Sequence, residues 1–113
     1  DVGVSGAKPD GSAWRVAISD PEQPDSPLHT VELSSGALAS SGSYARALEI
    51  NGQTYSHLLN PKTGYPFTGL QAASVVADQC TVAGSLATIA LLKQEQGRRF
   101  LEQTGLWYFL KGY

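Results

Sequence analysis

Hydrophobic and polar residues alternate through much of the first half of the chain, and a period of two is the pattern of half-buried β-strands. Residues 13–19 (AWRVAIS) show it clearly, because Trp14, Val16 and Ile18 all fall on one face. Three prolines and three acidic residues then crowd into residues 20–27, a composition that predicts a loop. The pattern therefore predicts a strand followed by a long turn.

Further strands are predicted downstream by the same alternation. Residues 28–44 contain two short strands. Residues 45–59 (ARALEINGQTYSHLL) are typical of a β-hairpin, because Asn51-Gly52 supplies the two positive φ angles of a type I′ turn. Residues 70–78 (LQAASVVAD) predict a buried strand.

The period changes to that of a helix in residues 80–97. Thr81 is placed to cap the start of this helix. Its apolar face is predicted from four residues at the spacing of helical neighbours, namely Val82, Leu86, Ile89 and Ala90.

A second, shorter helix is predicted in residues 98–105, where Gly105 stands at the position that a helix-terminating glycine prefers. The apolar residues 106–113 predict a final strand. Strands followed by helices and one more strand indicate an α+β fold, an antiparallel sheet with two C-terminal helices packed on it. We expect residues 1–113 to form a single domain.

Composition narrows the class of protein. With 42% hydrophobic and 16% charged residues, the chain is typical of a globular domain. The net charge of −2 and the scattered basic residues argue against nucleic acid as a partner. The single cysteine, Cys80, excludes an internal disulfide, and no apolar run is long enough to span a bilayer. Because the first residues look like the middle of a longer sequence, we expect a fragment.

Residues 55–69 (YSHLLNPKTGYPFTG) are the stretch whose side chains and turn geometry are best suited to binding a ligand. Pro61 fixes its own φ angle, and Gly64 can adopt a positive φ or let a ligand approach the backbone. Backbone N–H groups together with hydroxyls suit a phosphate or a ribose. The same residues also fit a plain hairpin and turn with a half-buried, hydrogen-bonded histidine. The polar side chains concerned are Ser56, His57 and Thr63.

Two other stretches are rich in small residues. In residues 40–46 (SSGSYAR), a ligand can approach the backbone and Tyr44 can stack on an aromatic ring, or Tyr44 is a core residue of a simple connection. In residues 83–88 (AGSLAT), Gly84 and Thr88 share one helical face, which either admits a ligand or packs tightly against the sheet. The chain has no nucleophile elbow, phosphate-binding loop or Gly-x-Gly-x-x-Gly motif.

Taken in order, these stretches resemble the C-terminal part of the ApbE family, the FAD:protein FMN transferases. The segments that carry the resemblance are AWRVAISDP, GALASSGSYAR, YSHLLNPKTGYPF and VAGSLATIALL, with S-H-x-x-x-P-x-T-G-x-P as the most distinctive core. The resemblance implies a partial, T-fold-like ApbE domain whose N-terminal half is missing here. Asp1 matches the aspartate of a G-G-D segment near the middle of the family's sequence.

The resemblance also implies an activity. Members of this family transfer FMN from FAD to a Thr or Ser hydroxyl of a target flavoprotein and release AMP, assisted by Mg²⁺. Implied partners are FAD and subunits of sodium-pumping (Nqr-type) and Rnf-type redox complexes, in a periplasmic or inner-membrane-associated location. Attack of a hydroxyl on a pyrophosphate needs charge neutralisation and in-line positioning more than a covalent catalyst. The alternative is a non-catalytic FAD-binding module that has lost its metal site.

The resemblance assigns roles to particular residues. His57 is the candidate catalytic residue that orients flavin or phosphate, and Thr88 offers an oxygen to the metal. The remaining metal ligands and much of the FAD surface belong to the family's N-terminal half. The implied cofactor-binding residues are Ser41, Gly42, Tyr44, His57, Leu58, Pro61, Thr63 and Gly64.

Two positions depart from the family pattern. Gly84 stands where the family's A-D-A-x-x-T helix has its metal-binding aspartate, and Ser43 replaces the acid of S-G-D-Y. Both departures remove negative charge from the expected site, so a hard cation there loses carboxylate ligands.

Overall fold

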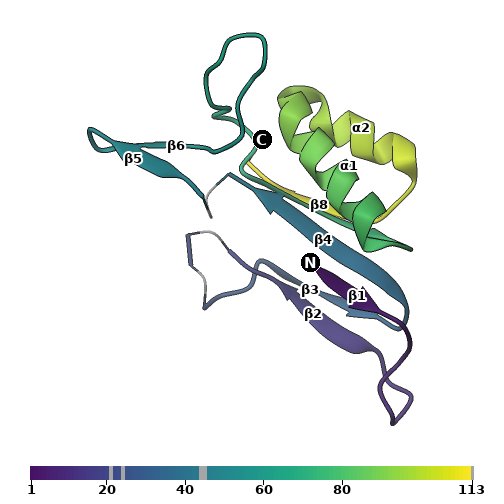
Figure 1. The fold of residues 1–113 in the computed structure, drawn as a ribbon. Helices are drawn as coiled ribbons and strands as arrows, with labels where there is room; N and C mark the ends of the chain where they lie inside the picture. The colour runs from purple at the N-terminus through teal and green to yellow at the C-terminus, as the bar shows by residue number, and fades with distance from the viewer. Residues whose placement is uncertain (21, 24, 44–45, 113) are drawn as a thin grey trace.

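The structure is a computed structural model that describes residues 1–20, 22–23, 25–43 and 46–112 (Figure 1). Its elements, in chain order, are β1 (Val2–Val4), β2 (Trp14–Ile18), β3 (His29–Leu33), β4 (Gly36–Gly42), β5 (Leu48–Ile50), β6 (Gln53–Tyr55), β7 (Ala72–Ala77), α1 (Cys80–Lys93), a 3₁₀ turn (Gln94–Gln96), α2 (Gly97–Thr104) and β8 (Tyr108–Lys111).

The described residues build three layers around a four-stranded antiparallel sheet, with strand order β1-β4-β7-β8. Helix α1 lies against β4 and β7 on one face, and α2 packs beside α1 (Figure 1). The β2–β3 hairpin covers the other face, where Ile18 and Leu33 pack against Leu38 of β4. The predicted α+β fold, an antiparallel sheet with C-terminal helices on it, is confirmed. None of the helices in the described part of the chain is long and apolar enough to cross a membrane.

Helix α1 meets the sheet through alanines. Ala83, Ala87 and Ala90 are completely buried, and they share one core with Ala39 of β4 and Ala73 of β7. Since each of these side chains is a single methyl group, the helix backbone can lie close to the strands without leaving a void.

The apolar face predicted for this helix is confirmed only in part, because Ala90 is completely buried and Leu86 packs against the core but Val82 and Ile89 lie outside it. Val82 and Ile89 are 44% and 39% exposed, whereas the alanines that follow or neighbour them are buried. Because the sheet presents small side chains to the helix, close approach of the two backbones decides which face is buried. The predicted cap was also wrong: α1 begins at Cys80, Gln79 is its N-cap, and no side-chain hydrogen bond caps it. Thr81 therefore lies inside the first turn.

The strand and turn predictions are confirmed more closely. The type I′ turn between β5 and β6 has positive φ angles at both Asn51 (52°) and Gly52 (77°). Helix α2 ends at Gly105, which has φ of 70°. Strand β1 was not predicted, because three residues are too few to show a period.

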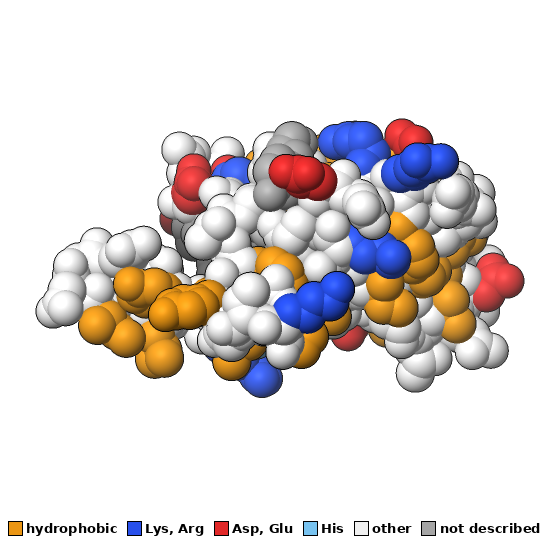
Figure 2. Space-filling view, turned by 90° about the horizontal axis from the view of Figure 1, so that it is seen from above, with side chains coloured by type: hydrophobic (Ala, Val, Ile, Leu, Met, Phe, Trp, Pro, Cys, Tyr) orange, Lys and Arg blue, Asp and Glu red, His pale blue; other side chains and the backbone are white. Residues whose placement is uncertain are grey.

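The β5–β6 hairpin projects from the three layers (Figure 1). Hydrophobic side chains gather on this projecting part in the space-filling view of Figure 2, and Leu48 and Ile50 are among the exposed ones. The hairpin therefore contributes little to the core, and the loop that begins at Ser56 follows it directly.

The junction between α1 and α2 depends on close packing at Gly97. A β-carbon at this buried position would overlap the carbonyl oxygen of Ala90 and lie 3.3 Å from Cδ2 of Leu70. The side chain of Gln94 fastens the same junction, because its Oε1 accepts the N–H of Leu70 at 2.8 Å and its Nε2 donates to the carbonyl of Leu91 at 2.6 Å. The second helix can fold back on the first because this position carries no side chain.

We expect Gly97→Ala to lower the free energy of unfolding by about 1–3 kcal/mol, because the added methyl has no room. Gly84→Ala is the matched control within α1. A β-carbon there meets Cβ of Ala39 at 3.7 Å, an ordinary contact, so the helix preference of alanine should raise the same free energy by about 0.5–1 kcal/mol. Urea unfolding followed by circular dichroism measures both variants. If Gly97→Ala and Gly84→Ala changed the free energy of unfolding in the same direction, the difference in packing at the two glycines would not explain the effects.

Candidate functional site

Ser41 and Thr88, two of the residues singled out from the sequence, lie side by side. Ser41 stands on β4 and Thr88 on α1, and their hydroxyl oxygens are 2.7 Å apart and share a hydrogen bond. Both side chains are half-buried and line one hollow of about 420 Å³. Gly84 and Asp1 line it as well. The fold thus gathers four residues of this hollow from two elements, β4 and α1, and from the start of the chain.

The hollow offers a cation hydroxyl groups but little negative charge. Among the described residues that line the hollow, only Asp1 has a carboxylate. One oxygen of that carboxylate accepts the backbone N–H of Ser40 at 3.3 Å. Gly84 contributes no side-chain oxygen. Among the described residues, no three His, Cys, Asp or Glu side chains come together as a metal site. Because carboxylates anchor Mg²⁺ in proteins and the one carboxylate here already accepts a backbone N–H, these residues do not by themselves fit a magnesium ion.

The loop between β6 and β7 is shaped by its own hydrogen bonds. The carbonyl of Asn60 accepts the N–H of Gly64 at 2.8 Å, and its side-chain oxygen accepts the N–H of Lys62 at 2.9 Å. Gly64 has the positive φ (74°) that its position in the turn requires. At the start of the loop, the N–H of Leu58 donates to Oγ of Ser56 at 3.0 Å, and the Leu58 side chain packs on the core. The loop is therefore locally rigid and anchored by one leucine.

This loop lies near the C-terminal end of α1. Thr63 lines a hollow of about 430 Å³ together with Lys93 and Gln94. His57 and Pro61 are exposed, so His57 is not the half-buried histidine of the simpler alternative. Nor does His57 line the hollow that contains Thr88. The described residues therefore place the predicted site residues in more than one hollow.

The remaining predicted residues lie around the end of β4. Gly42 is half-buried opposite Ala72 of β7. The backbone N–H and the hydroxyl of Ser43 both donate to the carbonyl of Gln71, at 2.9 and 3.2 Å, and Ser43 lines a polar hollow of about 600 Å³. Tyr44 lies outside the described residues. Ser43 therefore faces a different hollow from Thr88.

An ion pair that the sequence pattern does not predict lies beside this polar hollow. Nζ of Lys111 on β8 is 2.7 Å from a carboxylate oxygen of Asp20 and 3.5 Å from one of Glu22. The hydrogen bond lowers the pKa of the Asp20 carboxyl and raises the pKa of Lys111. Because Glu22 lines the hollow, the pair holds part of its wall. A partner 91 positions away leaves no signal in a local pattern.

Known proteins match this chain over almost its full length. The sequence model of the ApbE family matches residues 1–110. The FAD:protein FMN transferase of Vibrio cholerae is 32% identical over 105 residues, which cover 90% of this chain and 31% of that protein.

Solved structures match it too. The crystal structure of the ApbE protein of Thermotoga maritima superposes with a TM-score of 0.81 at 30% identity, covering 93% of this chain and 35% of that one. The apo flavinyl transferase ApbE of Pseudomonas stutzeri gives a TM-score of 0.73 at 33% identity, covering 96% of this chain and 34% of that one.

The chain therefore spans about a third of the length of the relatives it matches. Sequence and fold agree over the same region, and the motifs around Ser41, His57 and Thr88 all fall inside it. The resemblance inferred from the sequence is confirmed, and this chain belongs to the ApbE family.

Proposed function

We propose that this chain is part of an FAD:protein FMN transferase. The observation that carries the proposal is the sequence match, over nine tenths of the chain, to a protein of that name, and the fold match to a flavinyl transferase ApbE supports it. The substrate is FAD, and the product is a target flavoprotein that carries FMN on a Thr or Ser hydroxyl. The hydroxyl oxygen bonds to the phosphorus on the FMN side, the pyrophosphate bond breaks, and AMP leaves while the hydroxyl proton is lost.

The chain's contribution is to bind and orient FAD. The rigid turn from Pro61 to Gly64 forms one wall, with Leu58 fixed in the core behind it. His57 stands exposed at the start of this loop, where its ring can donate to a phosphate or contact the flavin. Ser41 and Thr88 supply hydroxyls at the second hollow. Binding and alignment of this kind provide much of the catalysis in phosphoryl transfer.

We also propose that Mg²⁺ assists the complete protein, where it would neutralise charge on the pyrophosphate. Thr88 is the residue of this chain proposed to offer it an oxygen. Since Asp1 is the single carboxylate at that hollow and Gly84 adds none, the described residues do not fit the ion alone, and no step is assigned to it here.

The same shortage of carboxylates favours a second candidate function, an FAD-binding module that does not transfer FMN. Gly84 and Ser43 stand at the two positions where the family pattern has acids. A protein that has lost these charges can keep the walls of a flavin site while losing the metal.

Targets and location follow from the family resemblance alone. We propose subunits of Nqr-type and Rnf-type redox complexes as acceptors, and a periplasmic or inner-membrane-associated location. A labelled acceptor that receives flavin from this protein in cell extracts identifies the target directly.

Transfer is tested with this chain inside a complete ApbE-family domain, incubated with FAD, Mg²⁺ and an acceptor flavoprotein domain. We expect flavin fluorescence that stays on the acceptor through a denaturing gel. Tight FAD binding without such fluorescence would support the non-catalytic module. Absence of FAD binding would contradict both candidates.

The role of His57 is tested by His57→Ala in the same protein. We expect FAD affinity or the transfer rate to fall about tenfold, which corresponds to about 1.4 kcal/mol. The matched control is His29→Ala, because His29 is the second histidine and its ring stacks on Trp107 and Phe109, with centroids 5.4 and 5.8 Å away. If His57→Ala left both the FAD affinity and the transfer rate equal to those of the unsubstituted protein, His57 would not belong to the site.

Gly84→Asp tests whether the missing carboxylate weakens magnesium binding. The position has room, since a β-carbon there makes one ordinary contact with Ala39. We expect the affinity for Mg²⁺, measured by isothermal titration calorimetry, to rise about tenfold or more as the hollow gains a second carboxylate. Gly84→Ala, which adds the β-carbon but no charge, should leave it unchanged. A flat response to the aspartate would show that this hollow is not the metal site.

A further inference from the structure

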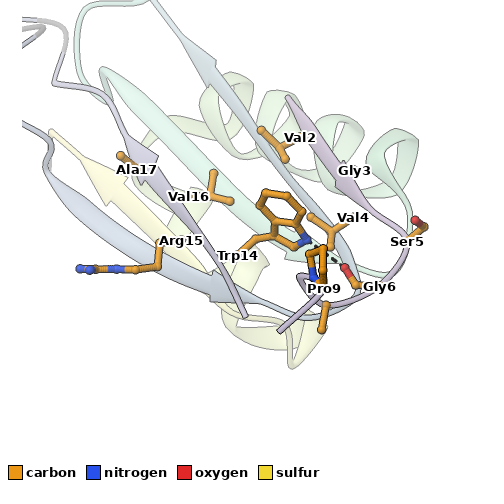
Figure 3. A pocket seen from close by; sticks show the side chains of 11 residues that line it. Val2, Gly3, Val4, Ser5, Gly6, Pro9, Trp14, Arg15, Val16 and Ala17 are labelled. Carbon is orange, nitrogen blue, oxygen red and sulfur yellow. Dashed lines mark hydrogen bonds between the residues drawn. The ribbon is translucent and has the colours of Figure 1, made fainter. Parts of the chain in front are cut away.

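An open apolar cleft lies between β1 and β2, and it shares no lining residue with the hollows at Thr88, Thr63 and Ser43. Its volume is about 760 Å³, and β1, β2 and the segment between them line it. Figure 3 shows the side chains of Val2, Val4, Trp14 and Val16 around one space. A smaller hollow of about 180 Å³ shares Val2, Val16 and Ala17 with it, so the two adjoin.

The cleft presents apolar side chains, and the one polar atom of its largest side chain, Trp14, already has a partner. The indole N–H of Trp14 donates to the carbonyl of Gly6 at 2.9 Å, and Nζ of Lys8 lies 5.7 Å from the ring centroid. The ring nevertheless remains 44% exposed, and Val2 is 38% exposed. Large apolar side chains that gather at one exposed place mark a surface that contacts another molecule.

Both strands that border the cleft have a free edge. Within the described residues, β1 pairs with β4 alone and β2 with β3 alone. The unpaired N–H and C=O groups of such edges accept a further strand. A strand is favoured over a small molecule because it pairs with these edges, which a small molecule would leave unpaired. Arg15, a charged residue of the lining, points away from the cleft (Figure 3).

We propose that this cleft holds a β-strand from the remainder of an ApbE-family domain, on the same polypeptide or on a separate one. About two thirds of each matched relative lies outside the region that this chain covers, so that polypeptide is available in the family. The strand places alternate apolar side chains against Val2, Trp14 and Val16, and its backbone pairs with the edge of β1 or β2. The inference concerns assembly of the domain and is independent of flavin transfer.

The test is a chimera in which residues 1–113 replace the matched region of the Vibrio cholerae FAD:protein FMN transferase. Hydrogen exchange followed by mass spectrometry compares the chimera with the isolated 113-residue chain. We expect exchange in peptides that contain β1 and β2 to slow about a hundredfold in the chimera, because the free edges become paired and buried. Unchanged exchange in a chimera that unfolds cooperatively would overturn the proposal.

Val2→Asp provides a second, independent measurement. In the isolated chain this partly exposed position should tolerate the charge, whereas in the chimera the aspartate is buried and should lower the Tm by about 5 °C or more. Val2→Thr, which keeps the branched shape without a charge, is the matched control and should change little in either protein. Equal sensitivity of both proteins to Val2→Asp would count against the proposed strand.

Two other outcomes are also decisive. A dimer of the isolated chain with protected β1 and β2, seen by light scattering and exchange, would assign the cleft to a second copy and overturn the proposal. A chimera that does not fold is repeated with the Vibrio cholerae residues at the cleft positions. Recovery of folding would show that the cleft contacts the remainder of the domain, and failure to recover would contradict it.

Discussion

The close contact between α1 and the sheet is the constraint on which the rest of the structure depends. Methyl groups face each other across this contact, with the alanines of α1 on one side and Ala39 and Ala73 on the other. Any longer side chain there would push the helix away from the strands. Because Ser41 is on β4 and Thr88 is on α1, this spacing also sets the 2.7 Å separation of their hydroxyls. The same close packing of α1 on the sheet therefore stabilises the core and positions the two hydroxyls of the site.

Features that depend on neighbouring residues could be predicted from the sequence, and features that depend on distant ones could not. Alternation located most strands, and turn chemistry located Asn51, Gly52 and Gly105, because backbone preference acts within a few residues. The buried face of α1 was predicted only in part: Ala90 and Leu86 do face the core, but Val82 and Ile89 were also expected there, and the surface of the sheet, which no local pattern shows, selects the alanines instead. The ion pair of Lys111 with Asp20 had no local signal at all.

The candidate site divides in the same way. Family resemblance named Ser41 and Thr88, and the fold brings them together although they are 47 positions apart. The family resemblance also named His57 and Thr63. The hydrogen bonds of their loop lie within the loop itself, so the local sequence predicts the shape of the loop but not its distance from α1. In the described residues, the Thr88 hollow shares no lining residue with the one at Thr63.

A dinucleotide needs a continuous pocket that buries most of its surface, and separate open hollows do not provide one. The hollows at Thr63 and Ser43 adjoin, since both are lined by Phe67 and Thr68. The hollow at Thr88 shares no lining residue with either, so further polypeptide would have to enclose the space that joins all three. The cleft at Trp14 requires additional polypeptide for a different reason, namely exposed apolar side chains beside free strand edges. Under the proposals above, one additional polypeptide would complete the flavin pocket and cover the apolar cleft. About two thirds of each matched relative lies outside the region that this chain covers, which is length enough for both roles, and the proposed magnesium ion would take its further ligands from there.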